Sequence, residues 1–214
     1  MLFIFDWDGT LSDSTGNITT AMQAAARDLG WLVPEDHEVH NIIGLGLPEA
    51  VARLYPQVTD SGRSRLREAY RINFLALDAR QPSGFFPTAR ETIEYLRDEG
   101  HTLTIATGKS RLGLERILSS RGMKQFFHGT RCADETASKP HPLMLEQLLE
   151  DFRLPAAQAV MIGDTEYDMD MARRIAMPRI AVSYGAHALE RLQVYEPELC
   201  LHQFDELLEW QKLQ

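Results

Sequence analysis

Two carboxylates, Asp6 and Asp8, stand near the start of the chain, directly after the apolar run Leu2–Phe5. That run is rich in β-forming residues and predicts a buried strand, so both carboxylates lie in the turn at its carboxyl end. Gly9 follows and lets the backbone pass close to a ligand, since it has no Cβ. Carboxylates this close repel each other by about 4 kcal/mol at an effective dielectric constant of about 20. Such a cost is typical of a bound cation, a shared proton or a catalytic pair. The alternative is an acidic turn that caps a helix.

Three more polar clusters follow along the chain. They comprise Thr107 with Lys109, Lys139 in a Lys-Pro-x-Pro loop, and Asp164 with Asp168. Each cluster also has an ordinary explanation. Thr107 and Lys109 could be a helix cap and a surface charge, Lys139 could be a solvated loop lysine, and Gly-Asp-Thr could be a turn with an N-cap. Asp164 and Asp168 would destabilise a shared helix face, because like charges at i and i+4 repel. Together with Asp6 and Asp8, the clusters predict one site, since motif context is what confirms a motif.

The chemistry of such a site follows from its oxygen ligands. Carboxylates without His or Cys favour magnesium over zinc. We expect Asp6, a backbone carbonyl near Asp8 and Asp164 to hold the ion, which would clamp a phosphate oxygen. A lysine adds a positive charge beside the phosphoryl oxygens. A carboxylate nucleophile gives an aspartyl-phosphate, and a second carboxylate protonates the leaving alkoxide and then takes a proton from the attacking water.

Strand and helix patterns alternate from Pro87 onward, and these elements must position the clusters. The predicted strands cover residues 101–106, 129–132, 159–162 and 179–182. The predicted helices cover residues 88–99, 110–120, 143–152 and 204–212, and a further helix follows the motif that ends at Asp168. Alternation of this kind implies a parallel sheet with right-handed crossovers. Open sheets of this class bind ligands at the carboxyl ends of their strands, so the loops that carry the polar clusters share one edge.

Residues 15 to about 80 show helical spacing and no convincing strand. We expect Ser14 to cap the first of these helices. The pattern predicts a helical cap domain at 15–81, inserted into a core domain made of 1–14 and 82–214, with a hinge near Ser14 and Pro82-Ser83-Gly84. Gly44-Leu45-Gly46 breaks the cap helices, either close to the ligand or as a simple turn between helices.

Composition limits the possible partners. The chain has 214 residues, a net charge of −9 and a pI of about 5.3, which argues against nucleic-acid binding. No apolar run approaches the ~20 residues needed to span a membrane. The N-terminal run lacks a basic leader, so no signal peptide is expected. Two cysteines without CxxC spacing predict reduced thiols and a cytoplasmic protein. A monomer or a homodimer is expected.

The ordered motifs Asp-x-Asp-Gly-Thr, Thr-x-Lys, Lys-Pro-x-Pro and Gly-Asp-Thr-x-x-Asp resemble those of the haloacid dehalogenase superfamily. The resemblance spans nearly the whole chain, and it is greatest for the phosphoglycolate-phosphatase-like branch with a helical cap after the first motif. It implies an α/β fold with a Rossmann-like, three-layer core around a parallel sheet. Asp8 argues against dehalogenation, because true dehalogenases lack the second Asp of the first motif.

The resemblance also implies roles for individual residues. Asp6 would be the nucleophile and Asp8 the general acid and base. The phosphoryl group would be held by Thr107 and Lys139, with Gly108 and Lys109 at the substrate. Many relatives carry Asn at the position of Gly108, so the detail of that contact differs here. The expected Mg²⁺ site comprises Asp6, Asp8, Asp164 and Asp168.

The function expected from these motifs is a Mg²⁺-dependent phosphatase that acts on a small phosphorylated metabolite. The substrate would be a phosphomonoester, either phosphoglycolate-like or a sugar phosphate. Two alternatives remain: a sugar-phosphate mutase of the β-phosphoglucomutase type, and a catalytically silent protein that binds a phosphate ligand. The product distinguishes the two enzymes, and a generic phosphatase assay tests the silent protein.

Overall fold

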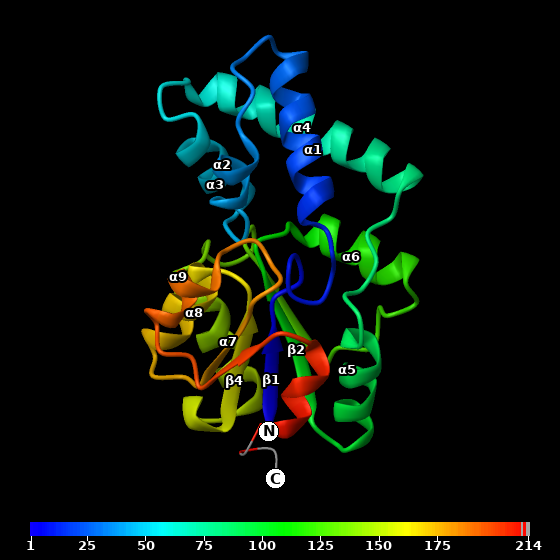
Figure 1. Ribbon diagram of the computed structural model, residues 1–214, viewed down its shortest axis with the longest axis vertical. Coiled ribbons are helices and arrows are strands. Elements are labelled where there is room, and N and C mark those ends of the chain that lie inside the picture. The colour runs from blue at the N-terminus through cyan, green and yellow to red at the C-terminus, as the bar shows by residue number, and fades with distance from the viewer. Residues whose placement is uncertain (211, 213–214) are drawn as a thin grey trace.

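The structure, a computed structural model, describes residues 1–210 and 212 (Figure 1). Its centre is a parallel sheet with the strand order β3-β2-β1-β4-β5-β6. The strands are β1 (Leu2–Phe5), β2 (Thr102–Thr107), β3 (Gly129–Cys132), β4 (Ala159–Gly163), β5 (Arg179–Val182) and β6 (Leu199–Leu201). Because all strands run in one direction, their carboxyl ends meet at one edge.

Strand β1 lies in the middle of the sheet and is buried on both faces. Phe3 and Phe5 belong to one hydrophobic cluster, and Leu2 and Ile4 belong to another. Successive side chains of a strand point to opposite faces, so this alternation shows that helices cover the sheet on both sides. In register, Phe5 lies beside Ile105 of β2 and Ile162 of β4, which places the turn after β1 between two other strand ends.

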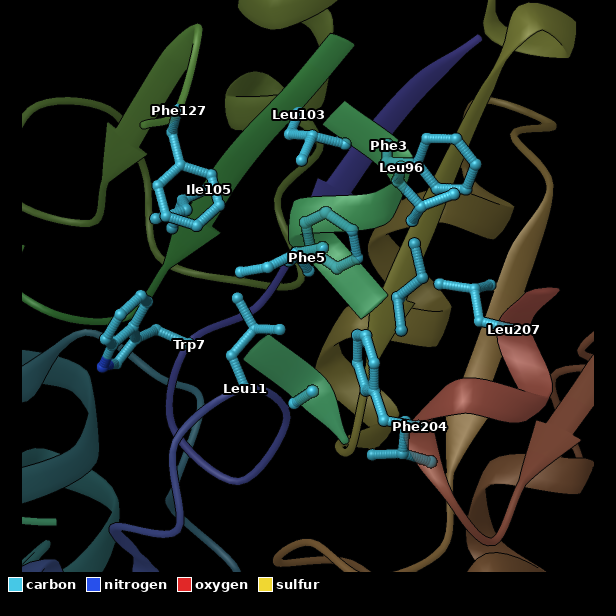
Figure 2. Close-up of a cluster of buried hydrophobic side chains, with 14 of the residues drawn as sticks. Phe3, Phe5, Trp7, Leu11, Leu96, Leu103, Ile105, Phe127, Phe204 and Leu207 are labelled. Carbon is cyan, nitrogen blue, oxygen red and sulfur yellow. The ribbon is translucent and has the colours of Figure 1, made fainter. Parts of the chain in front are cut away.

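Helices form the two outer layers of the core. The helical elements are α5 (Ala89–Asp98), α6 (Arg111–Ser120), α7 (Leu143–Phe152), η1 (Ala156–Gln158), α8 (Glu166–Arg173), α9 (Leu189–Gln193) and the 3-10 helix η2 (Phe204–Glu209). Residues of α5, α6 and η2 pack on the face of Phe3 and Phe5, and residues of α7 and α8 pack on the opposite face. Figure 2 shows Leu96 of α5 and Phe204 and Leu207 of η2 in the first of these clusters. The predicted α/β class with a three-layer, Rossmann-like core is therefore confirmed.

The segment between β1 and the rest of the core forms helices with a hydrophobic cluster of their own. They are α1 (Thr15–Asp28), α2 (Asp36–His40), α3 (Leu47–Leu54) and α4 (Asp60–Arg80). Figure 1 shows them gathered at one end of the molecule, with α1 packed against α4. Their shared cluster includes Met22, Val51 and Leu66, which are fully or almost fully buried. The division at 15–81 stays a prediction.

Three details near the C-terminus differ from the pattern-based expectation. Strand β6 and helix α9 were not predicted, because three and five residues are too few to show a period. The predicted helix 204–212 is a 3-10 helix that ends at Glu209. Residue 211, which the prediction included, lies outside the described residues. Within the described residues, no helix has the length and apolar character needed to cross a membrane.

Candidate active site

Asp6 follows the last residue of β1, and its backbone N–H donates to the carbonyl of Ile162 at 2.9 Å. The side chain is buried, and its Oδ1 lies 2.8 Å from Nζ of Lys139. The same Nζ lies 2.7 Å from Oδ1 of Asp168 in α8. The lysine side chain is 0% exposed, so the ordinary interpretation of Lys139 as a solvated loop lysine is wrong. Three separate motifs of the sequence therefore meet at the carboxyl edge of the sheet.

Asp164 completes a group of buried carboxylates at this edge. One oxygen each from Asp6, Asp164 and Asp168 lies within 4.8 Å of the others. Oδ2 of Asp6 has no hydrogen-bond partner in the described part of the chain. Three carboxylates face the single ammonium of Lys139, so the cluster lacks positive charge. An ion that takes several oxygen ligands, such as Mg²⁺, fits this donor set, whereas zinc sites in proteins usually include His or Cys.

The shifted pKa values of these side chains reflect their burial and the excess of carboxylates over ammonium groups. Burial raises the pKa of Asp164 to about 7, and the charge of Asp168 adds to the rise. Burial also raises the pKa of Asp6 well above the usual carboxyl range, against the opposing charge of Lys139. Burial alone would lower the pKa of Lys139, but Asp168 and Asp6 more than offset it, and its pKa stands above the usual lysine value. A bound cation would relieve the excess of negative charge.

Hydroxyl and amide groups from other parts of the chain hold the carboxylates in place. Thr10 Oγ1 donates to Asp164 Oδ1 at 2.8 Å, and the N–H of Ala186 donates to Asp164 Oδ2 at 2.7 Å. Thr165 caps α8, and its Oγ1 donates to Asp168 Oδ2 at 2.6 Å. Sequence reasoning assigned no role to Thr10 or to the amide of Ala186, and it considered the cap at Gly-Asp-Thr only as the alternative to a site, whereas Thr165 caps α8 and also contacts Asp168. Thr10 and Thr165 were visible inside two of the motifs, whereas a backbone amide at residue 186 carries no sequence signal.

Gly9 allows this close assembly. Its φ is +79°, a conformation that costs glycine little, and a Cβ there would lie 2.1 Å from Oδ2 of Asp164. The backbone of the first motif thus passes directly against the carboxylate. The predicted close approach of the Gly9 backbone to a ligand stays a prediction, and the close approach that the structure shows is to Asp164.

Asp8 lies outside the three-carboxylate group. Its Oδ2 lies 3.0 Å from Nζ of Lys109, and its Oδ1 accepts a hydrogen bond from Ser14 Oγ at 2.5 Å. Ser14 occupies the N-cap position of α1, but its side chain makes no cap hydrogen bond. The expectation that its side chain caps the helix is therefore wrong, because the hydroxyl is engaged by Asp8. Asp8 and Asp6 line the same cavity, and the predicted roles of Asp8 in proton transfer and in the metal site stay predictions.

The motif after β2 contacts Asp8 through Lys109. Thr107 is the last residue of the strand and is fully buried, and its Oγ1 accepts from the N–H of Lys109 at 3.2 Å. A Cβ on Gly108 would lie 2.6 Å from the carbonyl oxygens of both Gly44 and Leu45 in the cap. The absence of a side chain at 108 therefore lets the cap backbone contact the core.

A cavity of about 360 Å³ lies between this edge of the core and the cap helices. Asp6, Asp8, Gly108 and Lys109 line it from the core, and Leu45 is one of the lining residues from the cap. Both interpretations of Gly44-Leu45-Gly46 describe part of what the structure shows. The segment connects α2 to α3, and Gly44 and Leu45 also line the cavity. The predicted site residues Thr107, Lys139, Asp164 and Asp168 are buried and are not among the residues that line this cavity.

The chain is similar to known proteins in sequence and in structure. The family model for haloacid dehalogenase-like hydrolases matches residues 3–182. The chain is 30% identical to "Probable phosphatase IndB" of Dickeya dadantii, over 97% of this chain and 91% of that one. It is 28% identical to a phosphoglycolate phosphatase of Vibrio parahaemolyticus, over 97% and 94%. A solved haloacid dehalogenase-like family hydrolase from Streptococcus pneumoniae superposes with a TM-score of 0.84 at 26% identity, over 98% of this chain and 97% of that one.

Proposed function

The chain belongs to the haloacid dehalogenase-like hydrolase family, and on that premise we propose that it is a Mg²⁺-dependent phosphatase that hydrolyses small phosphomonoesters through an aspartyl-phosphate on Asp6. The observation that carries the proposal is that Asp6 belongs to the buried carboxylate group and also lines the cavity beside Asp8. Two relatives named as phosphatases support a phosphate ester as substrate. Phosphoglycolate and sugar phosphates are the first substrates to test.

Asp6, Asp164 and Asp168 would hold the cation, either directly or, for Asp168, through the outer shell. When bound, Mg²⁺ supplies Lewis-acid polarisation of a phosphoryl oxygen and offsets the negative charge of the carboxylates. The hydrogen bonds from Thr10 to Asp164 and from Thr165 to Asp168 orient these two carboxylates. Such outer contacts orient metal ligands in many sites.

In the first step, a carboxylate oxygen of Asp6 attacks phosphorus and the bond from phosphorus to the ester oxygen breaks. Asp8 gives its proton to the departing alkoxide, so the alcohol leaves neutral. In the second step, Asp8 takes a proton from a water molecule that attacks the phosphorus of the aspartyl-phosphate. Phosphate leaves, and Asp6 is restored as a carboxylate.

Lys139 positions the nucleophile. Its ammonium contacts both Asp6 and Asp168, so it fixes the carboxylate of Asp6 relative to α8. The same charge stands beside the place where a transferred phosphoryl group would carry negative charge. Thr107 comes from the neighbouring strand end, and we assign its hydroxyl to the same phosphoryl group.

The test of this function is the release of inorganic phosphate from small phosphomonoesters in the presence of Mg²⁺. Release of phosphate supports the hydrolase, whereas isomerisation of a sugar phosphate without release supports a mutase. Binding of phosphate without either product would support the catalytically silent alternative.

Removal of divalent metal is expected to abolish turnover, and added Mg²⁺ is expected to restore it. Calcium is expected to restore less activity, because its higher and looser coordination misplaces the nucleophile. The measurement is phosphate release from p-nitrophenyl phosphate after chelation and titration with each ion. Full restoration by zinc alone would contradict the oxygen-only metal site.

An Asp8→Asn protein is expected to lose on the order of 10²–10⁴ in kcat, because the amide neither donates nor accepts the required proton. The loss should be smallest for esters with acidic alcohols, whose leaving groups need little protonation. The measurement is kcat for a series of aryl and alkyl phosphates with the wild-type and variant proteins. An equal loss across leaving groups of very different pKa would argue against the acid role of Asp8.

A further inference from the structure

The cavity above Asp6 has a strongly apolar wall on the side of the cap. Ile18 and Met22 of α1, Leu45 of the connecting turn and Phe74 of α4 all line it. Ile18 and Phe74 are buried in the hydrophobic cluster of the cap, so the wall is the outer surface of a packed core. The part of a substrate that extends away from the phosphoryl group would lie against these side chains.

The positive side chains that line the cavity each face a carboxylate already. Lys109 lies 3.0 Å from Asp8 and stacks over the ring of Phe74 at 5.1 Å. The other two are Arg71, which pairs with Glu68 at 3.0 Å, and Arg116, which pairs with Asp78 at 2.7 Å. A second negative group on the substrate, such as a carboxylate, would therefore share each of these cations with a carboxylate that already offsets its charge.

The apolar lining continues outward to the opening of the cavity. Leu75 of α4 is 40% exposed and Leu112 of α6 is 67% exposed, and both line the cavity. Large exposed leucines at the rim of a pocket are typical of a binding surface for an apolar group. The two leucines come from the cap and from the core, so an apolar group at the opening would contact both domains.

We propose that the preferred substrates are phosphomonoesters whose alcohol part is apolar and about the size of a six-membered ring, in preference to phosphoglycolate or sugar phosphates. The inference rests on the proposed phosphatase function and names its substrate class. The phosphoryl group would lie at Asp6, and the ring would lie against Leu45 and Phe74. A cavity of about 360 Å³ lies within the size range of small-molecule sites.

The physical reason is the cost of desolvation. Hydroxyl groups or a carboxylate that faced Met22, Leu45 and Phe74 would lose their hydrogen bonds to water and gain none from these side chains. A hydrocarbon ring would instead be removed from water, which is favourable. The difference acts on the bound substrate and on the transition state, so it should appear in kcat/KM.

The test compares three primary alkyl phosphates with similar leaving groups: cyclohexylmethyl phosphate, glucose 6-phosphate and phosphoglycolate. Cyclohexylmethyl phosphate keeps the six-membered ring of the sugar phosphate and lacks its hydroxyls. We expect its kcat/KM to exceed those of the other two by about tenfold or more. A Leu45→Asn protein should lose most of this preference, while the exposed Leu32, which does not line the cavity, offers the matched control Leu32→Asn.

The outcomes separate this inference from the function on which it rests. Equal or faster Mg²⁺-dependent hydrolysis of glucose 6-phosphate or phosphoglycolate would overturn the substrate class and leave the phosphatase intact. A preference for the cyclohexyl ester that persists unchanged in Leu45→Asn would also overturn the proposed binding place. Release of phosphate from none of these esters, nor from p-nitrophenyl phosphate, would overturn the phosphatase function and the substrate class together.

Discussion

An Asp6→Asn protein is expected to fold and to lose phosphatase turnover by at least about 10³-fold, because an amide is a poor nucleophile toward phosphorus. No other side chain replaces Asp6 in the proposed first step. Asp8 lines the same cavity, but its carboxylate is engaged by Lys109 and Ser14. The measurement is steady-state phosphate release at saturating Mg²⁺, from p-nitrophenyl phosphate and from the best alkyl ester.

The Asp6→Asn protein should stay folded because the substitution removes a negative charge from a group of buried carboxylates. The side chain of Asp6 is only 1% exposed, so the substitution removes a buried charge. Asn at this position lowers the excess of negative charge, and Lys139 keeps Asp168 at 2.7 Å. Because the pKa of Asp6 is raised in the folded state, its ionised form costs stability above the ordinary carboxyl pKa. Metal-free Asp6→Asn should therefore unfold at the same temperature as the wild type or higher.

The control is Asp13→Asn, which makes the same change at an exposed carboxylate of the same turn region. Wild-type turnover is expected for it. Full activity in a folded Asp6→Asn protein would rule out the aspartyl-phosphate mechanism.

Lys139→Ala is expected to lower both stability and turnover. The change leaves the carboxylates of Asp6 and Asp168 buried without their common counter-ion. Breaking a buried ion pair by removing one partner typically costs about 3–5 kcal/mol. The measurement is the free energy of unfolding of the metal-free protein in denaturant, together with kcat in Mg²⁺.

Lys124 is exposed and offers the matched control, since surface substitutions usually stay within about ±0.5 kcal/mol. Lys139→Met combined with Asp6→Asn should regain part of the lost stability, because the buried ammonium and one carboxylate are removed together. A Lys139→Ala protein with wild-type stability and turnover would show that the buried ammonium contributes to neither, and it would contradict the role assigned to Lys139.

The sequence was most informative where a buried strand ends in charged residues. The runs that became β1, β2 and β4 are apolar and bounded by polar motifs, so both their existence and the common edge of their loops were predictable. Strand β6 was missed because Leu199–Leu201 is short. Its place in the sheet comes from pairing with β5, which is a non-local contact.

In the site, too, the sequence indicated which residues belong together but not the contacts between residues far apart in the chain. Asp6, Asp164 and Asp168 were predicted as carboxylates of one site, and the structure brings them together. The hydrogen bond from Thr10 to Asp164 joins residues 154 positions apart, and no local pattern contains it. The position of Ser14 before a helical pattern predicted a helix cap, but its hydroxyl donates a hydrogen bond to the carboxylate of Asp8 instead.

The configuration at phosphorus tests the central claim most directly. The substrate is a phosphorothioate ester made chiral at phosphorus with oxygen isotopes, hydrolysed in water that carries the remaining isotope. Transfer first to Asp6 and then to water inverts phosphorus at each step, so the account predicts net retention in the thiophosphate product. Net inversion would mean that water attacks the ester directly, and it would contradict a covalent intermediate on Asp6.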